Sequence, residues 1–250
     1  MKSVEGLRTN GSDVYVPFGW EAFLRKCGHM LRTSDDKLPV AGHIVGRLAH
    51  LAALQTTWAL DELFADDWRS ARMRGPLFII GHQRSGTTLM HRLLASDKVH
   101  ARALALHEMA LPSVSFQALV KQVAEWDRAN GEKLRKRFDR YQDRIFGPLD
   151  SIHHIRLDEI EEDEFVLWAV FASGMCANDS PDAMNCRDID YLREFHDWPE
   201  KRQRQILGWY RACLLKKIYR EPSGSKDDPP WIVAKNPAFS HKITDLLETF

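Results

Sequence analysis

The most constraining feature of this sequence is a glycine-containing loop that joins a short apolar segment to a segment with helical character. The apolar segment, residues 76–81, reads PLFIIG, and the loop ends at Gly86. A brief apolar run bounded by Pro and Gly is typical of a buried β-strand. The next segment, TTLMHRLL at residues 87–94, is a good opening for a helix. A strand, a tight loop and a helix in this order predict an α/β fold.

The loop has the chemistry of an anion-binding site. Gly86 allows the backbone to fold tightly enough for successive N–H groups to point inward. The helix that begins after it adds free amides and the positive end of its dipole. The hydroxyls of Ser85, Thr87 and Thr88 add donors, and Arg84 adds a permanent positive charge. We therefore expect this loop to bind a phosphate or sulfate group.

The spacing from Gly81 to Gly86 matches the G-x-x-x-x-G of the Walker A phosphate loop, but Thr87 replaces the Lys that should follow. A kinase or nucleotide hydrolase needs that Lys on the β- and γ-phosphates of its nucleotide, and normally a metal-binding Asp after another strand. We find neither. A P-loop kinase or hydrolase therefore remains an alternative, but the pattern disfavours it.

The rest of the chain is mostly helical, with one further strand. The second short apolar segment, Trp231–Ala234, predicts another buried strand, and a helix follows it to Phe250. Helical spacing of apolar residues predicts helices within residues 18–72, 113–146, 160–172 and 199–220. The predicted fold class is α/β, with a P-loop NTPase-like parallel sheet and extensive helical insertions. We expect a single domain over residues 1–250, with a helical region at 1–75 and the core at 76–250.

Charged segments outside the loop have ordinary structural explanations. The acidic run Glu161–Glu164 is expected to open a helix, because acidic side chains favour a helix N-terminus. Arg92 is expected to form a salt bridge, and the basic run Lys133–Arg137 to form a solvated helix face. His153 and His154 lie near acidic residues, but a metal site there is disfavoured for the same reason.

The loop and three further segments resemble one enzyme family. Residues 78–94, FIIGHQRSGTTLMHRLL, are similar to the 5′-phosphosulfate loop of sulfotransferases, in particular a branch common in bacteria and related to tyrosylprotein sulfotransferases. Gln83 stands where that branch usually has Pro. The pair His107-Glu108 before Pro112 resembles a W-E…P segment of the family. Residues 148–168 resemble its H…P-E-E stretch, and residues 231–237, WIVAKNP, resemble its strand ending in K-x-P.

The resemblance implies a reaction and a set of site residues. The donor would be 3′-phosphoadenosine 5′-phosphosulfate (PAPS), its sulfuryl group would pass to a hydroxyl acceptor, and no metal would be required. Arg84 would contact the sulfuryl group and Lys235 the bridging oxygen of the donor. Glu108 would take the acceptor's proton, with His107 as the alternative base. The donor-binding residues would be Arg84, Ser85, Gly86, Thr87, Thr88 and Leu89, and His153 and His154 would line the acceptor pocket.

One part of the family pattern is not found in these 250 residues. Sulfotransferases bind the 3′-phosphate of the donor through an R-D-P type segment and a Ser, which would follow the last predicted helix. We therefore expect either a fragment of a sulfotransferase or a shortened homologue. A non-catalytic protein that retains the anion loop and binds partners through its charged helices is the second alternative.

Composition limits the partners. Lys plus Arg and Asp plus Glu both number 35, so no overall charge favours nucleic acid. No stretch approaches the roughly 18 apolar residues of a membrane helix, and the N-terminus lacks the apolar core of a signal peptide. The four cysteines show no CxxC spacing, which suits a reducing compartment. We expect a cytoplasmic protein without a membrane span; no pattern indicates its acceptor or its oligomeric state.

Overall fold

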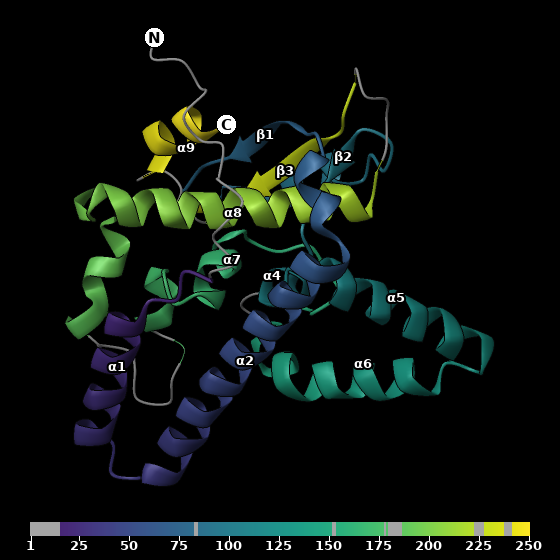
Figure 1. Ribbon diagram of the computed structural model, residues 1–250. Helices are drawn as coiled ribbons and strands as arrows, with labels where there is room; N and C mark the ends of the chain where they lie inside the picture. Colours follow the sequence, from purple (N-terminus) through teal and green to yellow (C-terminus); the bar gives the residue numbers. More distant parts are fainter. Residues whose placement is uncertain are drawn as a thin grey trace.

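The computed structural model describes residues 16–82, 85–151, 154–177, 179, 187–222, 228–237 and 242–250. Within these ranges the protein is mostly helical and contains a small parallel sheet (Figure 1). This confirms the predicted α/β class with heavy helical elaboration. None of the helices in the described ranges combines the length and the apolar character needed to cross a membrane.

The sheet has three strands in the order β1-β3-β2, and both strand pairs are parallel. Strand β1 spans Arg74–Ile79, β2 spans Ala101–Arg102, and the central strand β3 spans Trp231–Lys235. The two predicted strands are confirmed, although β1 begins before Pro76. Strand β2 has no counterpart in the sequence analysis, because two residues are too few to show a hydrophobic period.

The predicted helical segments are confirmed, with breaks that the sequence did not reveal. The helices are α1 Trp20–Thr33, α2 Lys37–Phe64, α3 Thr87–Leu94, α4 Leu106–Ala110, α5 Val114–Ala129, α6 Lys133–Phe146, α7 Glu164–Ala169, α8 Glu200–Arg220 and α9 Ile243–Thr249. The first segment divides because Asp36 caps α2, its side chain accepting from the Leu38 amide at 3.0 Å. Residues 113–146 divide at Gly131 and Glu132, which have φ of 92° and 59°.

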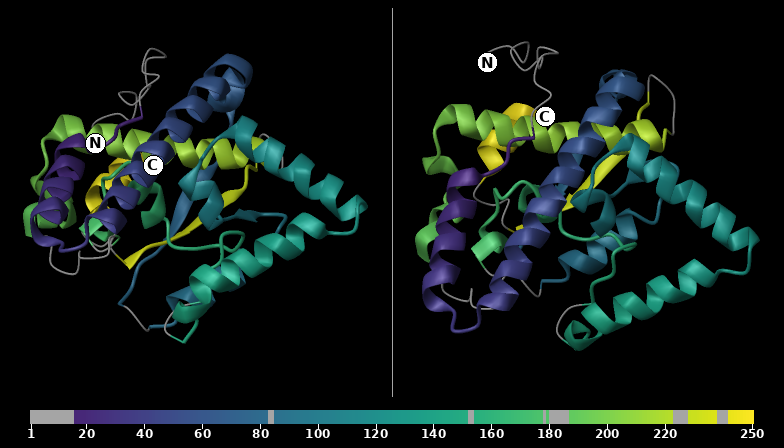
Figure 2. Two further views of the ribbon diagram at one scale, coloured as in Figure 1. Left: turned by 90° about the horizontal axis from the view of Figure 1, so that it is seen from below. Right: turned by 60° about the horizontal axis from the view of Figure 1, so that its bottom comes forward.

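Helix α8 organises the body of the protein. It runs across the molecule and packs against α5 and α7, and α1 and α2 pack against each other on one side of it (Figure 1). Helices α5 and α6 form a hairpin that extends away from this body in both further views (Figure 2). The core follows α8: Ile206, Tyr210 and Leu214 are each at most 1% exposed.

A buried ion pair ties three helices together. Asp61 of α2 and Lys216 of α8 are 0% and 1% exposed in their side chains, and their charged atoms lie 2.9 Å apart. Asp61 also accepts from the backbone amides of Val114 at 2.7 Å and Ser115 at 2.8 Å, at the start of α5. The Lys216 ammonium lies 3.2 Å from the ring centroid of Trp58. Asp61 thus satisfies the free amides of one helix and the buried charge of another.

We expect Asp61→Asn to lower the free energy of unfolding by about 3–5 kcal/mol, because it leaves Lys216 as an uncompensated buried charge. Urea unfolding measures this loss. The double variant Asp61→Asn/Lys216→Met removes that charge as well and should recover part of the loss. If the double variant is as unstable as the sum of its two single variants, the pair is not coupled.

Candidate functional site

The loop between β1 and α3 depends on its two glycines. Gly86 has φ of 82°, in the left-handed region that favours glycine, and it is the N-cap of α3. At Gly81 a Cβ atom would lie 3.0 Å from Cγ2 of Thr87 and 3.1 Å from Oγ of Ser85, so a larger residue would require these side chains to shift by a few tenths of an ångström. The carbonyl of His82 accepts from Ser85 Oγ at 2.6 Å, which tightens the turn. The sequence therefore places glycine where the turn needs it.

The first turn of α3 carries amides that no residue within the helix can accept from. The first backbone bond that closes this helix runs from the Met90 amide to the Gly86 carbonyl at 3.1 Å. Within the described ranges, no bond is made by the preceding four amides, those of Gly86, Thr87, Thr88 and Leu89. Such amides, together with the positive end of a helix dipole, attract an anion. Arg84, predicted to contact the transferred group, lies outside the described residues.

Helix α3 is fixed against the sheet by a buried histidine. His91 is 1% exposed, and its Nε2 donates to the Val233 carbonyl of β3 at 3.0 Å. Burial lowers the pKa of His91 to about 4, so the ring is neutral at neutral pH. On the outer side of the helix, Arg92 binds Glu159 at 3.0 Å, which confirms the predicted salt bridge. Both contacts fix the position of α3, and with it the amides of its first turn.

Lys235 lies at the sheet edge from which the loop leaves. It pairs with Ile79, the last residue of β1, and the amide of Asn236 donates to the Ile79 carbonyl at 3.3 Å. The strand ends therefore place Lys235 at the carboxyl edge, as the sequence predicted, where α/β folds hold their ligands. Its side chain is 2% exposed, and Nζ lies 2.5 Å from Oε1 of Glu162.

The acidic run Glu161–Glu164, which leads into the first residue of α7, holds the end of β3. Glu162 binds the Lys235 ammonium, the amide of Asp163 donates to the Lys235 carbonyl at 3.2 Å, and Glu164 accepts from Nδ2 of Asn236 at 2.6 Å. The expectation that this run opens a helix is wrong for its first members, because α7 begins only at Glu164. The partners of the acidic run are Lys235 and Asn236, a cation and an amide that follow a buried strand. Their polar character is the sequence signal that could have indicated this contact.

Asp163 is a buried acid within this contact. It is 1% exposed, and its Oδ2 accepts from the hydroxyl of Tyr210 at 2.8 Å. Burial raises the pKa of Asp163 to about 7, although the Tyr210 hydrogen bond lowers it in part. An unfolded Asp titrates near pH 3.9, so this group favours the folded state most at low pH. Its contribution is lost as the pH rises toward 7.

We expect Asp163→Asn to destabilise the protein more at pH 4 than at pH 7.5. The two destabilisations should differ by about 4 kcal/mol, because only the wild type loses the contribution of a neutral buried carboxyl over that range. Urea unfolding of both proteins at the two pH values tests this. An equal destabilisation at both pH values would contradict the raised pKa.

Glu108, the predicted base, is engaged in a buried ion-pair network. Both of its oxygens lie within 3.0 Å of Lys217 Nζ, and Arg220 Nη2 lies 2.8 Å from Oε1. The amide of Ala105 donates to Oε2 at 2.9 Å. Burial alone raises the pKa of Glu108, but the charges of Arg220 and Lys217 outweigh it and leave the pKa below its usual value. These contacts give Glu108 a structural role.

The ion pairs of Glu108 extend toward the start of β3. Lys217 also binds Glu221 at 2.6 Å, and the Glu221 carbonyl accepts from Arg102 at 3.0 Å. Arg102 pairs with Ile232, near the start of β3. Because a strand rises about 3.3 Å per residue, Lys235 lies about 10 Å further along β3. Within the described ranges, Glu108 and Lys235 bind different partners: Lys217 and Arg220 bind Glu108, and Glu162 binds Lys235.

We expect Glu108→Gln to lower the free energy of unfolding by about 3 kcal/mol, because it leaves two cations without their buried counter-ion. The matched control is Glu125→Gln on the exposed face of α5, which should change stability by less than about 0.5 kcal/mol. Chemical denaturation compares the two variants. Unchanged stability in Glu108→Gln would leave this carboxylate free for a proton-transfer role.

The predicted histidines occupy different environments. His107 is half-buried, its amide donates to the Leu157 carbonyl at 2.8 Å, and burial lowers the pKa of its ring. His154 is exposed, with Nδ1 3.0 Å from Asp150 and Nε2 3.3 Å from Glu159. Glu159 binds Arg92, so His154 lies on the α3 side of the molecule. His153 lies outside the described residues.

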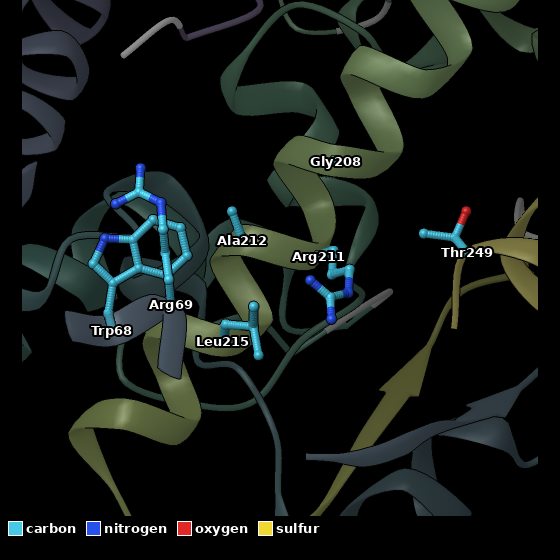
Figure 3. A pocket seen from close by; sticks show the side chains of 7 residues that line it. All are labelled: Trp68, Arg69, Gly208, Arg211, Ala212, Leu215 and Thr249. Atoms are coloured by element: carbon cyan, nitrogen blue, oxygen red, sulfur yellow. The ribbon is translucent and has the colours of Figure 1, made fainter. Parts of the chain in front are cut away.

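A pocket lies on another part of the surface. It is formed along α8 and does not include any of the predicted site residues (Figure 3). It is lined by Trp68, Arg69, Gly208, Arg211, Ala212, Leu215 and Thr249.

Among the described residues, no group of three His, Cys, Asp or Glu side chains could hold a metal ion.

A parallel sheet with a tight glycine loop between its first strand and a helix defines a P-loop-like α/β fold. Comparison with known proteins identifies the family. Residues 76–250 match the family described as "Sulfotransferase family", and the chain belongs to it. The matched region begins at β1 and includes the loop, Lys235 and α9.

Known relatives support the same assignment. The chain is 29% identical over 183 residues to the omega-hydroxy-beta-dihydromenaquinone-9 sulfotransferase Stf3 of Mycobacterium bovis and to that of Mycobacterium tuberculosis. These matches cover 70% of this chain and 39% of each relative. The crystal structure of sulfotransferase STF9 from Mycobacterium avium matches the fold with a TM-score of 0.62 and 18% identity, over 92% of this chain and 54% of that one.

Proposed function

We propose that this chain binds 3′-phosphoadenosine 5′-phosphosulfate and transfers its sulfuryl group to a hydroxyl acceptor. The observation that carries the proposal is the start of α3, where four successive amides make no bond within the described ranges. Membership of the sulfotransferase family supports sulfuryl transfer. The chain spans 39% of the length of its curated relatives, so the activity of those whole proteins is extended to it here as a proposal.

The loop fits a nucleotide phosphosulfate better than a nucleoside triphosphate. Thr87 follows Gly86 where a Walker loop would have Lys, so the β- and γ-phosphates would lack their usual cation. A 5′-phosphosulfate instead needs amides around one phosphate and a cation at the bond that breaks. The amides from Gly86 to Leu89 would bind the phosphate, with the hydroxyls of Ser85, Thr87 and Thr88 around it. Lys235 at the adjoining strand end would bind the bridging oxygen.

In the proposed reaction the acceptor oxygen attacks the sulfur atom. The bond between sulfur and the bridging oxygen breaks, its electron pair leaves with adenosine 3′,5′-bisphosphate, and the hydroxyl proton passes to a base. Charge grows on the bridging oxygen, which a positioned ammonium stabilises. Arg84, Lys235 and the α3 amides would supply that stabilisation and hold the groups in line.

Glu108 and His107 remain the proposed candidates for the base. Glu108 could serve only if Lys217 and Arg220 released it, because both of its oxygens are occupied. His107 is neutral at neutral pH, since burial lowers the pKa of its ring, and a neutral ring can accept a proton. His153 and His154 remain proposed acceptor contacts.

The acceptor is proposed at the level of its reacting group. The two curated relatives are named for an omega-hydroxylated dihydromenaquinone, which carries the kind of hydroxyl that a sulfuryl group can modify. From the names of these relatives we extend only one feature to the acceptor of this chain, its reacting hydroxyl group.

The test is calorimetric binding of adenosine 3′,5′-bisphosphate, compared with ATP in the presence and absence of magnesium. We expect metal-independent binding of the bisphosphate. In Arg84→Ala this binding should weaken by at least about tenfold, because the bridging oxygen that Arg84 would stabilise stays on the 5′-phosphate of the bisphosphate, and a charge-assisted hydrogen bond contributes roughly 1.5–3 kcal/mol.

Other outcomes support the alternatives. Magnesium-dependent ATP binding in preference to the bisphosphate would support a kinase or hydrolase. A folded protein that binds neither nucleotide would support a non-catalytic protein that retains the loop and binds partners.

A further inference from the structure

We propose that Glu162 is the built-in counter-ion of the donor site and that the donor anion displaces it from Lys235. The inference rests on the proposed function, because it assigns a positioning residue to the site proposed for the donor. Glu162 would hold the Lys235 ammonium at the carboxyl edge of the sheet until the phosphosulfate arrives. The donor would then replace the carboxylate as the anionic partner of Lys235.

Lys235 and Glu162 form a close ion pair at the end of β3. Nζ of Lys235 lies 2.5 Å from Oε1 of Glu162, and Lys235 is the last residue of β3. The neighbouring strand β1 ends at Ile79, directly before the loop that leads to α3. The only cation placed at this edge by the described contacts is therefore already bound to a carboxylate. An ammonium has three donors, and within the described ranges Glu162 provides its acceptor.

The Lys235–Glu162 pair differs in exposure from two buried ion pairs that join helices. The side chains of Asp61 and Lys216 are 0% and 1% exposed, and those of Glu108 and Lys217 are 6% and 7% exposed. Lys235 is equally buried at 2%, but Glu162 is 29% exposed. The two enclosed pairs hold helices together. Glu162 is already partly solvated and can move further into solvent, whereas the buried lysine needs another anion in its place.

The backbone around Glu162 is anchored by contacts that do not use the Glu162 carboxylate. The amide of Asp163 is bonded to the Lys235 carbonyl, and Glu164 is bonded to Asn236. The Glu162 amide donates to Oε1 of Glu161 at 3.0 Å. These contacts hold the segment in place without the Glu162 carboxylate, so its side chain can leave Lys235 without loss of the strand contact.

Electrostatics gives the sign of the effect. A carboxylate beside an anion site repels the anion and neutralises the cation that should attract it. Glutamine has the same shape and can still accept from Lys235, but it carries no charge. Glu162→Gln should therefore bind anions more tightly than the wild type. A residue with a purely structural role would show weaker or unchanged binding after the same substitution.

The experiment titrates wild type, Glu162→Gln and Glu159→Gln with inorganic sulfate and with adenosine 3′,5′-bisphosphate at constant ionic strength. Glu159 is a matched control, because it is a partly exposed carboxylate that pairs with Arg92 on α3 rather than with Lys235. We expect Glu162→Gln to bind both anions about tenfold more tightly. Glu159→Gln should remain within about threefold of the wild type, since exposed charges are screened.

A second variant pair tests whether the effect acts through Lys235. In a Lys235→Met background, the gain from Glu162→Gln should shrink to less than about threefold, because the ammonium that it frees is absent. Thermal unfolding of each variant confirms that the comparison is made between folded proteins. An undiminished gain in the Lys235→Met background would overturn the exchange.

The two probes separate this inference from the proposed function. If the wild type binds the bisphosphate and Glu162→Gln binds it no better, the donor site stands and the exchange at Lys235 is overturned. If Glu162→Gln binds sulfate more tightly but no variant binds the bisphosphate, the exchange is supported and the proposed function fails. If no variant binds either anion, both are overturned.

Discussion

The candidate site depends on how β3 is held. This strand lies between β1 and β2, and the acidic residues before α7 bind its last residue and the one after it. His91 fixes the loop-bearing helix α3 to the same strand. The loop, α3 and Lys235 are therefore all positioned by β3. A shift of β3 would move the amides of α3 and the ammonium of Lys235 together. A site for an anion needs such fixed donors, because preorganised dipoles cost no rearrangement when the ligand binds.

The parts of the fold that the sequence predicted are those encoded locally. The two strands are short apolar runs, and the loop carries glycine at the two positions where the backbone needs it: Gly86 for its φ and Gly81 for its close contacts. The long helices show a regular apolar spacing. Strand β2 was not predicted because its two residues are defined by pairing with β3, and pairing across more than a hundred residues leaves no local pattern.

Charged residues were harder to interpret for a related reason. The acidic run before α7 has the composition of a helix N-terminus, but its members bind partners on β3 and α8 that lie far along the chain. Glu108 likewise lies next to a histidine in a segment that resembles a catalytic one, while its cations are on α8. A sequence shows which charges exist, whereas burial and long-range pairing decide what each charge does.

The strand order also has a consequence for how the protein is made. Arg74 of β1 pairs with Trp231 of β3, about 150 residues later, and β2 pairs with the same strand. Translation at roughly 5–20 residues per second separates the two by on the order of 10 s. During that interval β1 and the loop exist without the strand that completes the sheet, and an unpaired apolar strand is prone to aggregate. The loop after β1 can therefore gain its contacts with β3 only once residue 235 has been synthesised.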